Sequence, residues 1–169
     1  MSRPQSGTYP VYFDKYISLV NADDLISAFI DQRELIGGFF ESIPESKADY
    51  AYAPGKWTLK QLLQHIIDTE RIFAYRAFSF SRNEEQSLPG FDENAYAISS
   101  EADSRKWNSL CEELKQLRTS TELLFESLTP LQLEKSGKAN GNPCTVIAAG
   151  FIIVGHVYHH QQIVIDRYL

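Results

Sequence analysis

The sequence predicts an all-α protein, a four-helix bundle with one long crossover. Four segments repeat apolar residues at helical spacing, and they are separated by stretches rich in Pro, Gly and Ser. No segment alternates apolar and polar residues as a half-buried strand does. The connection between the second and third segments, about twenty residues from Glu84 to Asp103, is too long for a helical hairpin. Amphipathic helices of this length bury their apolar faces against one another in a bundle.

The first expected helix begins near Asp23 and Asp24, because acidic side chains stabilise a helix N-terminus. Its apolar positions extend from Leu25 to Phe40. Gly37 and Gly38 weaken the last turns, since glycine is a poor helix former.

The second expected helix opens at Thr58. Thr58 and Gln61 have the spacing of a capping box, in which each side chain bonds the backbone of the other residue. Its apolar face runs through Leu62, Ile66 and Phe73, and the helix is expected to end near Asn83.

The third expected helix starts at Asp103 or Ser104 and ends before Pro130. The fourth follows the segment GNPC, with Thr145 as its cap, and extends from Val146 to about Tyr168. We expect the crossover between the second and third helices to lie over one end of the bundle and to help wall a pocket.

The chain of 169 residues fits a single domain, residues 1–169, in which residues 1–15 form a loose N-terminal lead-in. With 16 basic and 22 acidic residues, the formal charge is −6, which disfavours nucleic-acid and anionic-membrane partners. Small molecules or other proteins are the expected partners. The N-terminus lacks the apolar core of a signal peptide, and a cytoplasmic location is expected.

The cysteines do not indicate a disulfide framework, and the longest apolar run does not indicate a membrane span. Cys111 and Cys144 form no spaced cluster. The run from Val146 to Val154 is far shorter than the roughly 20 residues that cross a bilayer. Cys144 lies near a helix N-terminus, a position that lowers a thiol pKa, but no histidine stands beside it, and we expect a structural role.

The histidines are the chemically informative residues. Three of the four lie in the stretch GHVYHHQQIVID, and His156 and His160 are four residues apart, on one helix face. His65 lies on the second helix, and it converges with this pair if the second and fourth helices face each other. Three imidazoles and an open position form a common catalytic metal site. His159 points about 60° away from the pair.

The alternative is that these histidines are ordinary helix residues, because a pair four residues apart also arises by chance. Three histidines suit zinc, nickel, cobalt, copper or iron, and the sequence does not choose among them. The chain contains no H-E-x-x-H motif, no Glu-x-x-His motif and no Gly-rich phosphate loop.

The segments KWTLKQLLQHIIDTERIFAYRAFSFSRN, LPGFDENAYA and GHVYHHQQIVIDRYL resemble the DinB superfamily, in particular its YfiT-like branch of metal-dependent enzymes. The resemblance covers the chain from about Tyr16 to Leu169. It implies a bundle with the helix order up, down, down, up. It also implies that His65, His156 and His160 hold a divalent transition metal, with zinc or nickel as the leading candidates.

The resemblance further implies an activity class. Members include thiol S-transferases that use bacillithiol, mycothiol or glutathione, so a low-molecular-weight thiol is an expected co-substrate. Others are metal-dependent hydrolases. A metal at the three histidines would lower the pKa of a thiol in the first case and of a water in the second.

Several residues near His65 and in the crossover are candidates for the surroundings of the site. Asp68 is a candidate catalytic residue that orients an imidazole or acts as a base; alternatively it pairs with Arg71 on the helix surface. Phe91 and Tyr96 are candidates for the pocket mouth, or they pack within the crossover.

Two arginines continue the second helix toward the crossover. Arg76, a candidate catalytic residue, and Arg82, a candidate substrate-binding residue, would bind the carboxylates of a peptide-like thiol. Alternatively, they anchor the crossover through Asp92 or Glu93.

Two rival functions remain open at the level of sequence. One is a non-catalytic, stress-related metal-binding bundle, and the other is a helical scaffold without a metal. An open fourth coordination position favours an enzyme, whereas a fourth protein ligand favours a structural site. A homodimer is expected from the resemblance, although no surface stripe identifies its interface.

Overall fold

The computed structural model describes residues 2–169 of the chain. Four long helices form the bundle: α2 (Leu25–Glu34), α3 (Leu59–Ser81), α5 (Trp107–Glu126) and α7 (Val146–Arg167). The shorter elements are α1 (Asp14–Ile17), α4 (Glu93–Ser99), α6 (Pro130–Glu134), β1 (Ser136–Ala139) and β2 (Asn142–Thr145). A π-helical turn (Leu35–Phe39) continues α2, and 3-10 turns occupy Val11–Phe13, Glu45–Lys47 and Ala102–Ser104.

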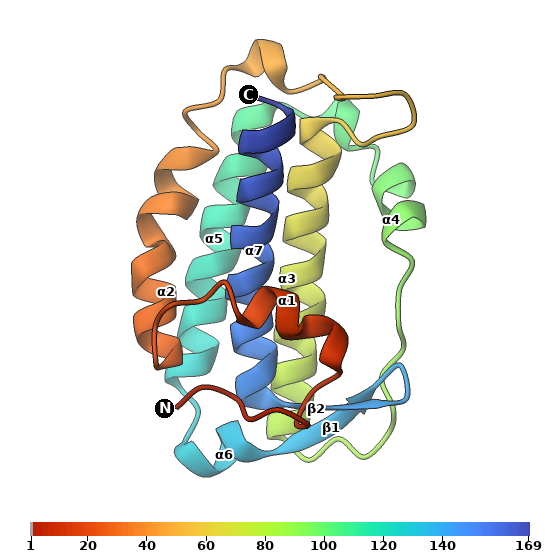
Figure 1. Ribbon diagram of the computed structural model, residues 1–169. Coiled ribbons are helices and arrows are strands. Elements are labelled where there is room, and N and C mark those ends of the chain that lie inside the picture. The colour runs from red at the N-terminus through yellow and green to blue at the C-terminus, as the bar shows by residue number, and fades with distance from the viewer. Residues whose placement is uncertain (1) are drawn as a thin grey trace.

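The four long helices follow the predicted order up, down, down, up (Figure 1). Helices α2 and α7 run in one direction and α3 and α5 in the other. Because α3 and α5 are parallel, their connection must return along the length of the bundle. The crossover therefore runs beside α3 and carries α4, instead of lying over one end as the sequence pattern suggested (Figure 1).

Helix α7 is the central helix of the bundle. Its residues from Ala148 to Val157 are all buried, and it packs against α1, α2, α3 and α6. A helix that is apolar on every side belongs in a core. Within residues 2–169, no helix has both the length and the apolar character that crossing a membrane requires.

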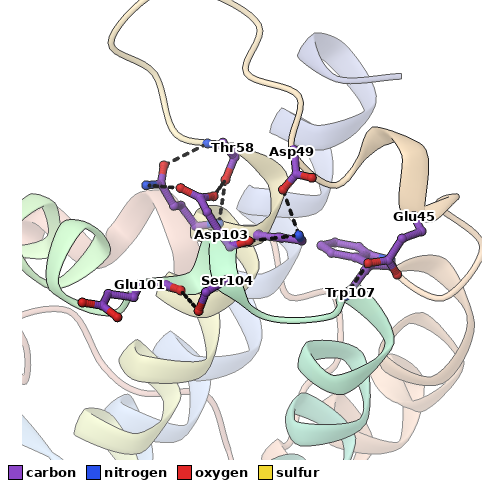
Figure 2. Close-up of polar contacts among 9 residues, drawn as sticks. Glu45, Asp49, Thr58, Glu101, Asp103, Ser104 and Trp107 are labelled. Atoms are coloured by element: carbon purple, nitrogen blue, oxygen red, sulfur yellow. Dashed lines mark hydrogen bonds and ion pairs between the residues drawn. The ribbon is translucent and has the colours of Figure 1, made fainter.

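The N-terminus of α3 is fixed by a polar cluster (Figure 2). The predicted capping box is present: Thr58 Oγ1 accepts from the Gln61 N–H at 3.1 Å, and the Thr58 N–H donates to Gln61 Oε1 at 3.0 Å. Asp103 joins this box, because its carboxylate accepts from Thr58 Oγ1 at 2.7 Å and from Gln61 Nε2 at 3.2 Å. Lys60 adds an ion pair with Asp49 at 2.8 Å.

Helix α5 begins at Trp107, three or four residues later than predicted. Asp103, an expected start of this helix, instead supports the start of α3. The acceptor at the start of α5 comes from a distant segment, since Glu45 Oε1 accepts from the Trp107 N–H at 3.0 Å (Figure 2).

The short hairpin of β1 and β2 was not predicted. Its register pairs Ala139 with Asn142, which leaves Asn140 and Gly141 as a two-residue loop with φ of 50° and 74°. Asn-Gly is the preferred pair for such turns, but strands of four residues leave almost no alternating pattern to read. Leu88 of the crossover pairs with this hairpin through hydrogen bonds of 2.9 Å to Lys138 and Asn140.

The N-terminal segment, expected to be a loose lead-in, packs against the bundle. Arg3 donates to the carbonyl oxygens of Ile17 at 2.8 Å and Ala22 at 3.2 Å. Tyr9 and Tyr16 are buried, and α1 lies against α7. Figure 1 shows this segment crossing in front of α7, where it covers one side of the helix that carries two of the candidate ligands.

Candidate metal centre

His65, His156 and His160 converge between α3 and α7. His65 Nε2 is 3.1 Å from His156 Nε2, and His160 Nε2 is 3.0 Å from His156 Nε2. Each residue offers a ring nitrogen, and the three nitrogens lie within 4.8 Å of one another. All three side chains are buried. Helical spacing brings His156 and His160 together, and the packing of α3 on α7 adds His65.

The spacing of these nitrogens fits a small divalent ion. An ion about 2.0–2.1 Å from each nitrogen in tetrahedral geometry sets those nitrogens roughly 3.3 Å apart. The two short distances, 3.1 Å and 3.0 Å, are close to that value. Within residues 2–169, no further His, Cys, Asp or Glu side chain belongs to the cluster. Three imidazoles would therefore leave a coordination position free.

The electrostatics keep the imidazoles in the form that binds metals. Burial, with a contribution from His159, lowers the pKa of His65 to about 4. Burial and the neighbouring histidines hold the pKa values of His156 and His160 well below the ordinary value. All three rings are consequently neutral at pH 7, and a neutral imidazole has the lone pair that a metal ligand needs.

The outer ring nitrogen of His160, Nδ1, is a buried polar atom without a hydrogen-bond partner within residues 2–169. Metal-bound histidines usually donate this second N–H to a carboxylate, carbonyl or water. On another side of the cluster, the ring of Trp57 packs against His65, with centroids 4.8 Å apart.

The three histidines line a cavity of about 520 Å³. This volume lies within the range of small-molecule sites. The N-terminal segment, α3, the crossover, the hairpin and α7 all contribute to its wall. Its wall includes Lys15, Tyr16, Phe73, Arg76, Glu93 and Ile152.

Asp68 and Tyr96 lie outside this cavity and border a separate hollow between α3 and α4. Asp68 accepts from Gln64 Nε2 at 2.8 Å and lies 3.8 Å from Arg71, so its partners are an amide and an arginine and not an imidazole. Three residues of helix turn Asp68 about 60° away from the direction of His65, toward α4. Burial raises the pKa of the Asp68 carboxyl group.

The remaining three candidates are divided between two hollows. Phe91 and Arg76 line the histidine cavity, and Arg76 Nη2 also anchors the crossover by donating to the Pro89 carbonyl at 2.9 Å. Arg82 is exposed and borders a different surface hollow with Tyr75. Neither arginine forms an ion pair with an acidic residue of the crossover within residues 2–169.

Tyr16 and Thr69 are wall residues that the sequence interpretation missed. The rings of Tyr16 and His156 form a T-shaped pair with centroids 5.3 Å apart, and the position of Tyr16 depends on long-range packing. Thr69, in contrast, follows His65 by four residues. Thr69, Phe73 and Arg76 share the helix face of His65, so this stripe was readable from the sequence.

Cys144 also lines the cavity, but it is not a reactive thiolate. Burial raises the pKa of its thiol to about 12, although the nearby Arg76 opposes this shift. The loss of hydration therefore raises the thiol pKa more than the helix N-terminus lowers it. A protonated thiol is consistent with the structural role expected from the sequence.

Comparisons with known proteins place the chain in a family. The family model described as the DinB superfamily matches residues 28–164. Among solved structures, the chain is similar to YfiT from Bacillus subtilis, described as a probable metal-dependent hydrolase with an unusual four-helix bundle topology. That match has a TM-score of 0.68 and 18% sequence identity, and it covers 97% of this chain and 90% of YfiT. No curated protein matches the sequence. The chain, with its YfiT-like bundle, therefore belongs to the DinB superfamily.

Proposed function

We propose that this protein is a metal-dependent enzyme in which His65, His156 and His160 hold one divalent transition metal, with zinc or nickel as the preferred ions. The observation that carries the proposal is the convergence of three neutral, buried imidazole nitrogens on the wall of a cavity. A divalent ion held there would act as a Lewis acid that lowers the pKa of a thiol or water at its open position. The cavity volume suits a small-molecule substrate.

We favour thiol S-transfer, with a bacillithiol-like thiol as co-substrate, over hydrolysis. Hydrolysis at a metal usually needs a base that takes a proton from water. Asp68, the carboxylate expected to serve as that base, borders another hollow. Within residues 2–169, the histidine cluster contains no carboxylate. Thiol transfer needs only a lowered thiol pKa and space for an electrophile, which three neutral ligands and the cavity would provide.

Hydrolysis is the second candidate, and a specific observation favours it. The structurally similar YfiT is described as a probable metal-dependent hydrolase. In that case Glu93, an acidic residue of the cavity wall, is the available carboxylate. A non-catalytic metal-binding bundle is the third reading, and it predicts metal binding without turnover.

Metal content is the first test. Tag-free protein incubated with zinc or nickel is expected to retain about one ion per chain by elemental mass spectrometry. The double variant His156→Ala/His160→Ala should lose that ion, whereas His159→Ala, which changes a neighbouring histidine outside the cluster, should keep it. Retention of the ion by the double variant would overturn the assignment of the ligands.

Turnover separates the chemical alternatives. The metal-loaded protein is tested with bacillithiol, mycothiol and glutathione, each with monochlorobimane as the electrophile, and separately with 4-nitrophenyl acetate. Metal-dependent formation of the thiol adduct supports S-transfer. Ester cleavage without adduct formation would overturn it in favour of hydrolysis.

A further inference from the structure

Arg76 is a buried cation in the cavity wall that lacks an anionic partner. Its side chain belongs to a residue only 6% exposed. Nη2 donates to the Pro89 carbonyl, but Nε is buried and has no hydrogen-bond partner within residues 2–169. In the same range, no acidic side chain forms an ion pair with Arg76. Leaving a charged group buried and unpaired is costly.

Another buried arginine of the protein, Arg118, is paired with a carboxylate. Arg118 is 2% exposed, and its Nε and Nη2 bind the two carboxylate oxygens of Glu70 at 3.0 Å and 2.9 Å. Arg118 lies in the bundle core, whereas Arg76 lines a cavity. The missing carboxylate at Arg76 can therefore be supplied by a ligand.

We propose that Arg76 binds a carboxylate group of the substrate at the end of the cavity away from the three histidines. The inference rests on the proposed function, because the histidine end is taken to hold the reacting group. A ligand group with a single negative charge matches the net charge of the cavity wall. In the metal-free protein, the charged side chains of the wall are Arg76, Lys15 and the acidic Glu93, which together amount to one positive charge. A carboxylate neutralises that charge, whereas a phosphate dianion would exceed it.

The geometry also indicates how far the carboxylate of the substrate should lie from its reacting atom. The guanidinium carbon of Arg76 lies 4.9 Å from the centroid of the Phe73 ring. Phe73 follows His65 by eight residues, about 12 Å of helix at about 1.5 Å per residue. The carboxylate and the reacting atom should thus be on the order of 10 Å apart. Phe73 and Ile152 line the space between them, so the connecting part of the substrate should be apolar.

The carboxylate site can be tested without a metal. Octanoate has a suitable length and no thiol, and 1-octanol is its neutral counterpart. Calorimetry on metal-free protein should show octanoate binding at least about tenfold more tightly than 1-octanol, because hydrogen bonds to a charged group are the stronger ones. Arg76→Gln should abolish this preference while leaving 1-octanol binding unchanged. Arg82→Gln, on the same helix but beside another hollow, should change neither.

A role for Arg76 limited to anchoring the crossover makes a different prediction. Loss of the Pro89 contact alone would lower stability without affecting the preference for a carboxylate. Arg76→Lys keeps the charge and should retain part of that preference, which keeps the test valid if Arg76→Gln folds poorly. Equal binding of octanoate and 1-octanol to the parent, no octanoate binding, or an unchanged preference in Arg76→Gln would each overturn the proposal. Tighter binding of octyl phosphate than of octanoate would overturn the choice of anion.

The metal-loaded protein separates this inference from the proposed function. There, 8-mercaptooctanoate is compared with 8-mercapto-1-octanol. If the histidines bind no metal, the thiols should bind no better than octanoate and 1-octanol, but the carboxylate preference should persist. If the Arg76 site is wrong, both thiols should bind with equal affinity and the metal content should be normal.

Discussion

Gly155 and Tyr16 meet through their backbones. A Cβ atom placed on Gly155 would lie 2.1 Å from the Tyr16 carbonyl oxygen, a distance that real Cβ atoms do not adopt. The missing side chain lets α1 rest directly on α7, one residue before His156. Tyr16 then becomes part of the cavity wall, with its ring in a T-shaped pair with that of His156. A single glycine thus couples the N-terminal segment to the candidate metal centre.

Gly155→Ala should force α1 away from α7. The obstructing atoms are backbone and cannot rotate aside, so we expect a loss of about 2 kcal/mol in the free energy of unfolding. Urea unfolding measures this change. Gly38→Ala is the matched control, because a Cβ there meets no atom within 4 Å, and alanine should be neutral or slightly stabilising. Equal stabilities of the two variants would contradict the close approach.

The buried ion pair of Glu70 and Arg118 provides a second prediction. Glu70→Ala leaves the guanidinium buried without a counter-charge, and the expected loss is about 3–5 kcal/mol. Lys115, whose partners Glu41 and Glu112 have side chains 43% and 56% exposed, is the control, and Lys115→Ala should cost at most about 1 kcal/mol. Urea unfolding of both variants gives the comparison. A Glu70→Ala loss as small as that of Lys115→Ala would show that water or another group compensates Arg118.

The lowered histidine pKa values predict that the metal-free protein is destabilised by acid. The pKa of His65 is about 4 in the folded protein and about 6.5 in the unfolded chain. Between these values the unfolded chain binds the extra proton, so the free energy of unfolding decreases as the pH falls from 6.5 to 4. His65 alone should contribute about 3 kcal/mol to this decrease.

Urea unfolding with a chelator present, at several pH values from 7 to 4, tests this dependence. His65→Gln removes the titrating group, so its stability should decrease less steeply than that of the parent over this range. Parallel curves for the two proteins would mean that His65 is not held neutral by burial.

Local signals made the starts of α2, α3 and α7 and the grouping of the three histidines predictable. The capping box at Thr58 and the cap at Thr145, whose side chain accepts from the Ala148 N–H, depend only on neighbouring residues. The expected convergence of His65 with the other two histidines needed one further assumption, that the second and fourth helices face each other. The structure brings the three rings together.

Features that depend on distant contacts could not be predicted from the sequence. The role of Asp103 at the start of α3 requires the crossover to end there, and the position of Tyr16 requires the approach to Gly155. Asp68 follows the alternative interpretation, in which it pairs with Arg71. Its spacing from His65 placed it near the site in sequence, but its angle around the helix directs it toward α4.

The cluster at the start of α3 supplies the last prediction. Thr58→Ala removes the cap of the helix that carries His65, and it also removes the hydrogen bond to Asp103. We expect a loss of about 1–2 kcal/mol, the upper part of the range for N-cap threonines. Thr129→Ala is the control, because Thr129 has the same capping box on the five-residue helix α6 and is exposed. That variant should lose less, since a short surface helix contributes less to the folded state. Urea unfolding compares the two, and an equal loss would mean that the contact with Asp103 adds nothing to the cap.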